Sequence, residues 1–272
     1  MSNAVEITRE DSLAIVTLNR PEKKNAWTLE VFDALSAASA GLAKADGLRA
    51  VILTGAGGCF SAGLDYAMFA EFAARLGEIR AEMLAPPEGR PANRFQQPVV
   101  GWQALGVPVI AAIEGVAFGA GLQLALAADF RIAAPDARFS VMEAKWGLVP
   151  DMGITRSLPK LLRADQAKEL IMSARVLEAP EALELGLITR IADTPMTAAR
   201  AMADRLMERS PAALAAAKKL VEEGWCGEAS ATLALEARLQ AGLMGTPGQS
   251  GTAMAELRRR FPASGRRGRG RS

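Results

Sequence analysis

Residues 113–155, IEGVAFGAGLQLALAADFRIAAPDARFSVMEAKWGLVPDMGIT, decide how the chain is interpreted. The stretch opens on a turn of small residues, Gly115 to Gly121, that leads directly into an apolar helical run. It closes on two carboxylates, Glu143 and Asp151, on either side of a Trp-Gly-Leu-Val-Pro turn. Backbone N–H groups at the start of a helix can stabilise an oxyanion, and nearby acids can move protons. The stretch therefore predicts acid–base chemistry beside a developing negative charge.

Short apolar runs alternate with helical patterns around this stretch. The runs that predict buried strands are residues 49–54, 108–113, 129–134 and 187–191. Residues 5–18 alternate apolar and polar side chains around a polar turn, which predicts a β-hairpin. The patterns that predict the longer helices are residues 28–43, 66–84 and 94–105. Such alternation favours an α/β fold with parallel strands and right-handed crossovers.

Composition predicts three parts. Residues 1–196 carry the strand signals and are expected to form the core. Residues 197–262 are rich in alanine, read as helical throughout, and are expected to be an oligomerisation region. Residues 263–272 are basic and of low complexity, which predicts disorder.

Composition also excludes several kinds of site. The chain has no histidine, so Ser-His-Asp and Cys-His nucleophiles and most zinc sites are excluded, and we expect no metal. Two cysteines make no disulfide framework, and no apolar run is long enough to span a bilayer, so a cytoplasmic protein is expected. Seven of the 32 lysines and arginines lie between Arg258 and Arg271, which leaves 25 basic against 30 acidic residues elsewhere.

Four segments in this order resemble the enoyl-CoA hydratase/isomerase (crotonase) superfamily, over residues 5–260. They are LNRPEKKNAW (18–27), RAVILTGAGGCFSAGLD (49–65), PVIAAIEGVAFGAGLQLALAADFRIA (108–133) and FSVMEAKWGLVPDMGITRSLP (139–159). The resemblance implies a spiral of ββα units with a helical C-terminal trimerisation region, in a trimer or a dimer of trimers. It also implies an acyl-CoA thioester substrate and no cofactor beyond its CoA moiety.

The resemblance further implies how the thioester is bound. Its oxygen would accept hydrogen bonds from the backbone N–H groups of Leu64 and Ala120, where the family usually has glycine at the second position. Small residues at both bends let a thioester reach such N–H groups. The residues that would contact CoA are Lys24, Ala26, Ala62, Leu64 and Asp65.

The acids depart from the hydratase pattern of the family. Hydratases place one glutamate where Glu143 stands and another where this chain has Gln123, whose amide cannot exchange a proton at neutral pH. The pairing of Glu143 with Asp151 resembles the dienoyl-CoA isomerases, which suggests double-bond isomerisation with one carboxyl as base and the other as acid. An apolar surrounding would raise both pKa values.

Other interpretations stay open at this point. Glu143 alone could hydrate a 2-enoyl-CoA while Gln123 orients the water. Alternatively, Asp151 could be a nucleophile, in the way that an aspartate is in the aryl-CoA dehalogenases of the same superfamily. Asp151 could instead be only the N-cap of a helix, and Glu143 a solvated residue near a turn. A different class of function is CoA or RNA binding without catalysis. The basic tail lacks an aromatic residue to stack bases, so we expect no dedicated nucleic-acid site.

Overall fold

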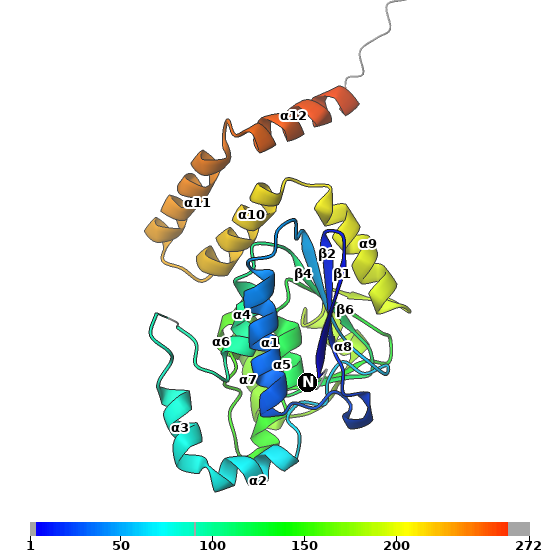
Figure 1. Ribbon diagram of the computed structural model, residues 1–272, viewed down its shortest axis with the longest axis vertical. Coiled ribbons are helices and arrows are strands. Elements are labelled where there is room, and N and C mark those ends of the chain that lie inside the picture. The colour runs from blue at the N-terminus through cyan, green and yellow to red at the C-terminus, as the bar shows by residue number, and fades with distance from the viewer. Residues whose placement is uncertain (1–3, 90, 261–272) are drawn as a thin grey trace, which may run out of the picture. The chain divides into compact units, whose positions relative to one another are not determined.

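The computed structural model describes residues 4–89 and 91–260, and the chain divides into two compact units, Met1–Met207 and Glu208–Ser272. The helix that precedes this boundary, α9 (Pro195–Met207), packs on strands of the first unit (Figure 1). The boundary therefore lies one helix later than the 196/197 boundary expected from composition. The expected disordered tail, residues 263–272, lies outside the described residues.

The first unit is built on a six-stranded sheet in the order β1-β2-β3-β4-β6-β9. The strands are β1 (Val5–Glu10), β2 (Leu13–Leu18), β3 (Ala50–Gly55), β4 (Val109–Ile113), β6 (Phe130–Ala133) and β9 (Arg190–Ile191). β1 and β2 form the antiparallel hairpin, and every other neighbouring pair is parallel. The predicted hairpin and parallel α/β arrangement are both confirmed.

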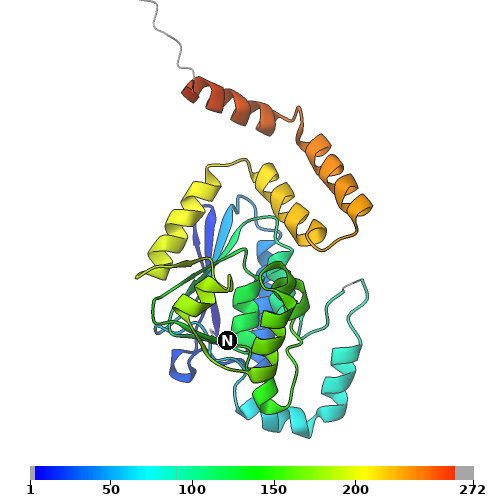
Figure 2. The same ribbon diagram turned by 180° about the vertical axis from the view of Figure 1, so that it is seen from behind.

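The central strands are buried on both faces. Side chains alternate: Ile52 and Ile110 belong to the cluster beneath α9, whereas Leu53 and Ala111 belong to the larger core. That larger core is covered by α1 (Leu29–Leu42), α4 (Gln97–Gln103) and α5 (Ala120–Ala127), which lie together on the opposite face of the sheet from α9 (Figures 1 and 2). Burial of each aliphatic side chain stabilises the folded state by ~1.5–3 kcal/mol. Strands that are buried on both faces therefore consist of continuous apolar runs.

A second, smaller sheet holds the small-residue turn of the opening stretch. Its order is β5-β7-β8, made by β5 (Val116–Phe118), β7 (Arg138–Ser140) and β8 (Leu177–Glu178). β5 and β7 run parallel, and β8 is antiparallel to β7. β5, a strand of this smaller sheet, leads directly into the start of α5.

The remaining helices connect these sheets or form the second unit. The first unit also contains η1 (Pro21–Lys23), α2 (Ala67–Ala74), α3 (Leu76–Leu84), η2 (Glu143–Trp146), α6 (Ile154–Ser157), η3 (Leu158–Lys160), α7 (Ala164–Ser173) and α8 (Ala179–Glu184). The second unit consists of α10 (Pro211–Gly224), α11 (Ala229–Leu243) and α12 (Pro247–Arg260). Among the described residues, no helix combines the length and the apolar character that crossing a bilayer requires.

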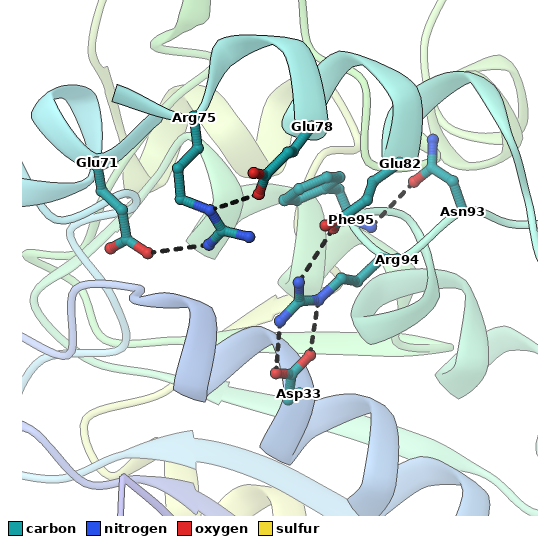
Figure 3. Close-up of polar contacts among 8 residues, drawn as sticks. All are labelled: Asp33, Glu71, Arg75, Glu78, Glu82, Asn93, Arg94 and Phe95. Atoms are coloured by element: carbon teal, nitrogen blue, oxygen red, sulfur yellow. Dashed lines mark hydrogen bonds and ion pairs between the residues drawn. The ribbon is translucent and has the colours of Figure 1, made fainter. Parts of the chain in front are cut away.

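In the insertion between β3 and β4, the sequence predicted one helix over residues 66–84, but the structure has two there, α2 and α3. The break is at Arg75, whose φ of −120° and ψ of 28° are not helical. Its guanidinium contacts Glu71 on one side of the break at 3.7 Å and Glu78 on the other at 2.9 Å (Figure 3). A helical period continues across such a break, so hydrophobic spacing alone does not reveal it.

Arg94 holds this insertion against α1. Its guanidinium forms two hydrogen bonds with Asp33 of α1, at 2.7 and 3.0 Å, and a third with Glu82 of α3 at 3.0 Å (Figure 3). The next residue back, Asn93, donates from Nδ2 to the carbonyl of Met83 at 2.8 Å. The hydrogen bonds to Asp33 and Glu82 raise the pKa of Arg94 despite its partial burial. Arg94 therefore joins two elements that are about fifty residues apart in sequence.

We predict that Arg94→Ala loosens the insertion more than it destabilises the fold. Partly exposed ion pairs contribute ~0.2–1 kcal/mol each, so the free energy of unfolding should fall by about 1 kcal/mol. Amide hydrogen exchange in α3 should become several-fold faster, because the contact that ties α3 to α1 is lost. The matched control is Arg163→Ala, whose guanidinium pairs with Asp165 in its own turn. Equal exchange in α3 for both variants would contradict the proposed role of Arg94.

Candidate functional site

The site begins where the two small-residue bends run side by side. The N–H of Ser61 donates to the carbonyl of Val116 at 2.8 Å, and the carbonyl of Ser61 accepts from the N–H of Phe118 at 3.0 Å. Ser61 and Ala117 are therefore partners in a short parallel bridge. In a parallel bridge, positions equally far along the two segments lie beside each other.

Leu64 and Ala120 each lie three residues beyond this bridge. Trp27 is paired with Leu64, and it uses the carbonyl of Gly63 and the N–H of Asp65, at 2.8 and 2.9 Å. The N–H of Leu64 therefore takes no part in that pairing. Ala120 is the first residue of α5, where a backbone N–H has no acceptor within the helix. The structure thus leaves both predicted donors outside the hydrogen bonding of their own elements, on adjacent bends.

Two glycines allow the bends to approach so closely. Gly63 has a φ of +90°, and a Cβ on it would lie 2.7 Å from the carbonyl oxygen of Phe118 and 3.7 Å from the N of Ala120. A Cβ on Gly121 would lie 2.6 Å from the Cβ of Ser61. Contacts under 3.0 Å force the backbone to shift, so neither position accepts a side chain without separating the bends.

Asn25 organises the loop that supports these bends, a role that sequence reasoning missed. Asn25 is 1% exposed. Its Nδ2 donates to the carbonyls of Ala56 at 2.9 Å and Cys59 at 2.6 Å. Its Oδ1 accepts from the N–H of Arg20 at 2.8 Å. The carbonyl of Asn25 accepts from the hydroxyl of Ser61 at 2.9 Å. Asn25 has a φ of +54°, which asparagine tolerates better than most residues, so an asparagine closing a polar loop was the available signal.

The residues that the sequence associates with CoA lie along the same loop. The N–H of Ala62 donates to the carbonyl of Lys24 at 2.9 Å, which places these two residues together. Lys24 is exposed, whereas Ala26 is buried at 8% exposure and offers little side-chain surface. Leu64 and Ala62 are half-buried. Contacts of these residues with CoA remain a prediction.

Asp65 has a structural use that the sequence did not reveal. Its carboxylate accepts from the N–H of Ala67 at 3.1 Å and pairs with Arg20 at 3.1 Å. The Ala67 N–H, followed by the Arg20 guanidinium, holds the pKa of Asp65 below its ordinary value. The carboxylate is therefore charged and occupied at the start of α2.

Glu143 lies at the start of η2 with its carboxyl turned inward. Oε1 accepts from Nε2 of Gln123 at 2.7 Å, and a Cβ on Gly119 would lie 3.5 Å from the same oxygen. Oε2 is buried and has no hydrogen-bond partner among the described residues. The alternative of a solvated glutamate is therefore wrong. A buried carboxyl oxygen without a partner is costly, and such exceptions concentrate at functional sites.

The surroundings raise the pKa values of both acids. Burial raises the pKa of Glu143 above its ordinary value; its own N–H and the amide of Gln123 oppose this, and the charge of Asp151 adds to it. Desolvation by the surrounding protein also raises the pKa of Asp151, although this residue keeps solvent exposure. The two acids are thus close enough to interact. The N-cap of α6 is Gly153, so the interpretation of Asp151 as a capping residue is wrong.

Apolar side chains gather beside the acids. The ring of Trp146, the last residue of η2, lies 5.6 Å from that of Tyr66 and 5.1 Å from that of Phe69, between centroids. Trp146, Leu148 and Val149 are all exposed. Phe69 of α2 and Trp146 of the acid-bearing segment therefore pack together, and the expected apolar enclosure of the carboxyls by Trp146, Leu148 and Val149 stays a prediction, since these three side chains are exposed.

We predict that Gly121→Ala reduces activity by more than tenfold and destabilises the fold by about 1–3 kcal/mol, because the new methyl group forces Ser61 away. The matched control is Gly77→Ala in α3, where an added Cβ meets nothing within 4 Å. That change should stabilise the chain by ~0.4–1 kcal/mol. Urea denaturation and turnover measured on both variants test this; a fully active Gly121→Ala would contradict the close-approach argument.

We also predict that Glu143→Gln stabilises the folded state at neutral pH. The pKa of Glu143 is raised from an ordinary value of 4.5, so the folded state binds this proton more tightly than the unfolded chain does. Its contribution to stability is complete below that ordinary value and is lost as pH rises through the raised folded pKa. The free energy of unfolding of the wild type, minus that of Glu143→Gln, should therefore fall as the pH rises. A difference that does not change with pH would contradict the assignment.

Comparison with known proteins agrees with this geometry. The sequence model of the family "Enoyl-CoA hydratase/isomerase" matches residues 8–261. Carnitinyl-CoA dehydratase of Salmonella typhi is 37% identical over 236 residues, which cover 83% of this chain and 85% of that protein. The crystal structure of an enoyl-CoA hydratase from Polaromonas sp. JS666 is similar with a TM-score of 0.84 at 30% identity, and covers 94% of this chain and 97% of that one.

An enoyl-CoA hydratase structure from Mycobacterium tuberculosis H37Rv is similar at 32% identity with a TM-score of 0.81, covering 95% of this chain and 97% of that one. These neighbours confirm the expected crotonase-like α/β fold. With the family match spanning nearly the whole chain, the protein is an enzyme of the enoyl-CoA hydratase/isomerase family.

Proposed function

We propose that this enzyme shifts a double bond of an enoyl- or dienoyl-CoA thioester, with Glu143 and Asp151 as the proton carriers. The observation that carries the proposal is the buried, unpartnered Oε2 of Glu143 in the neighbourhood of a second acid of raised pKa. A carboxyl whose pKa lies nearer neutrality exchanges protons efficiently at physiological pH. Two such groups can serve as base and acid within one turnover.

The reaction proposed is redox-neutral. One carboxylate takes a proton from a carbon of the acyl chain, the C–H electron pair enters the conjugated system, and negative charge develops on the thioester oxygen. The N–H groups of Leu64 and Ala120 stabilise that charge; one such donor contributes on the order of 10²–10³ in rate. The other carboxyl then donates its proton to a different carbon, and the carbonyl reforms. The hydrogen count and the oxidation level are unchanged, so the step needs no cofactor beyond the CoA moiety.

The charge interaction between the acids supports this division of labour. Asp151 in its charged form raises the pKa of Glu143, so the pair favours a state with one carboxyl protonated and the other ionised. That state contains the acid and the base together. The ring contacts of Trp146 with Tyr66 and Phe69 support an apolar acyl group next to the acids.

A second candidate is the reversible addition of water, supported by the names of the relatives: a carnitinyl-CoA dehydratase at 37% identity and structures titled as hydratases. In this reaction Glu143 would exchange the proton of water or of the leaving hydroxyl. Turnover in ¹⁸O-labelled water separates the candidates, because hydration places solvent oxygen in the product and isomerisation does not. CoA-ester binding without turnover of any ester would support the non-catalytic alternative.

We predict that Glu143→Gln and Asp151→Asn each lower kcat/KM by ~10²–10⁴, the range of general acid–base catalysis, with a smaller change in KM. The assay uses 2-enoyl-, 3-enoyl- and 3,5-dienoyl-CoA esters. The double variant should be little worse than either single variant, because the two groups act in one proton relay. Asp136→Asn is the control for loss of an exposed carboxylate. Undiminished turnover of every ester by both single variants would refute the roles assigned to these acids.

A further inference from the structure

Gln123 is the polar exception in a helix made otherwise of apolar and small residues. α5 reads AGLQLALA, and Gln123 is 2% exposed within it. Both ends of its amide are engaged: Oε1 accepts from the N–H of Met152 at 2.9 Å, and Nε2 donates to Oε1 of Glu143 at 2.7 Å. The side chain therefore connects the two segments that carry the acids, because Met152 directly follows Asp151.

These contacts fix the orientation of the amide. The N–H of Met152 can only donate, so the atom of Gln123 that faces it must be the carbonyl oxygen. The amino group then faces Glu143 and can only donate to it. The carbonyl oxygen of a neutral carboxyl is its better acceptor, so a donor at Oε1 favours the neutral form of Glu143 that carries its proton on Oε2. The oxygen that exchanges the proton is thus the same oxygen that has no partner among the described residues.

We propose that Gln123 is a positioning residue that ties Glu143 to the Asp151 turn and selects Oε2 of Glu143 as the oxygen that meets the acyl chain. This inference rests on the proposed function of the two acids. It assigns Gln123 neither a proton to transfer nor a water to orient. The amide of Gln123 instead holds Glu143 through its carboxyl, and it holds Asp151 through the N–H of the next residue, Met152.

A glutamate at this position would behave differently. A carboxylate could still accept from the N–H of Met152, but its other oxygen would lie at hydrogen-bond distance from Oε1 of Glu143. Two carboxyls at that distance must share a proton, which raises the pKa of the pair. The amide therefore keeps the proton exchange between Glu143 and Asp151 separate from residue 123.

Other charges near Glu143 leave this argument intact. α5 carries no charged residue, and α4 and β5, which pack on it, carry none either. The charged residues on the remaining elements packed against α5 and η2, or on η2 itself, are Lys145, Arg156, Asp165, Lys168 and Glu169. Asp165 pairs with Arg163, and Glu169 pairs with Arg175. The charge that acts on Glu143 is that of Asp151.

The test compares Gln123→Met with Gln103→Met. Both changes remove a buried glutamine amide: Gln103 is 7% exposed and donates to the hydroxyl of Ser157 at 3.0 Å rather than to an acid. We expect Gln123→Met to raise the pKa of Glu143 by about one unit, a tenfold change in proton affinity, because the donor to its charged form is lost. The amide of Met152 should also exchange faster. Gln103→Met should lower the midpoint of thermal unfolding without either effect.

The pKa is read from the carboxyl carbon resonance of ¹³C-labelled glutamate, assigned with Glu143→Gln, and independently from the acidic limb of the kcat/KM profile. Gln123→Glu is the second variant, for use if Gln123→Met does not fold. It should keep Met152 protected while shifting the acidic limb further than Gln123→Met does. An unchanged pKa of Glu143 in the Gln123 variants, or an equal shift in Gln103→Met, would overturn the proposal.

The resonance measurement does not depend on turnover. If Glu143→Gln retains full activity while the Gln123 variants shift the pKa, the proposed function fails and the contact of Gln123 with Glu143 stands without a role in the reaction. If Glu143→Gln is inactive and the Gln123 variants behave as wild type, the positioning role fails while the function of the acids stands.

Discussion

The close contact between residues 61–64 and 116–121 is the constraint on which the rest of the site depends. It is set by backbone hydrogen bonds from Ser61 to both neighbours of Ala117, and by the missing Cβ atoms of Gly63 and Gly121. Each segment follows a strand, so the central and the smaller sheet together determine where the bends meet. The contact leaves two peptide N–H groups outside regular hydrogen bonding, and it brings Gly119 to the carboxyl of Glu143. The acid is thereby placed relative to the same bend that presents one of those amides.

Desolvation raises the pKa values of Glu143 and Asp151, and a hydrogen bond to Glu143 partly opposes this effect. A buried carboxyl resists ionisation, which raises the pKa of Glu143, and the hydrogen bond from Gln123 partly restores the charged form. Desolvation also raises the pKa of Asp151, although this residue lies on a turn that keeps contact with water. Asp65, by contrast, has a backbone N–H and an arginine as partners and stays charged. Carboxyls in one unit of the chain thus differ in the direction of their pKa shift because their immediate partners differ.

Periodicity was a good guide where elements were long and poor where they were short. The hairpin and the apolar strands were predicted because burial on known faces leaves a repeating pattern, whereas the helices of the second unit, whose described residues are mostly not buried, were predicted from their alanine-rich composition. β5, β7 and β8 have two or three residues each, too few to show a period, so the smaller sheet was missed. Glu143 and Asp151 were found together through their place in a recognisable segment, yet the cap assigned to Asp151 was wrong because Gly153 begins α6. The contacts of Gln123 join residues up to 29 positions apart, which no local pattern reveals.

The main-chain donors proposed at Leu64 and Ala120 have a consequence for sequence divergence. A peptide N–H is present whatever side chain the residue carries, and only proline would remove it. A substitution at the half-buried position 64 can therefore change the volume of the side chain while the proposed donor to the thioester oxygen is kept.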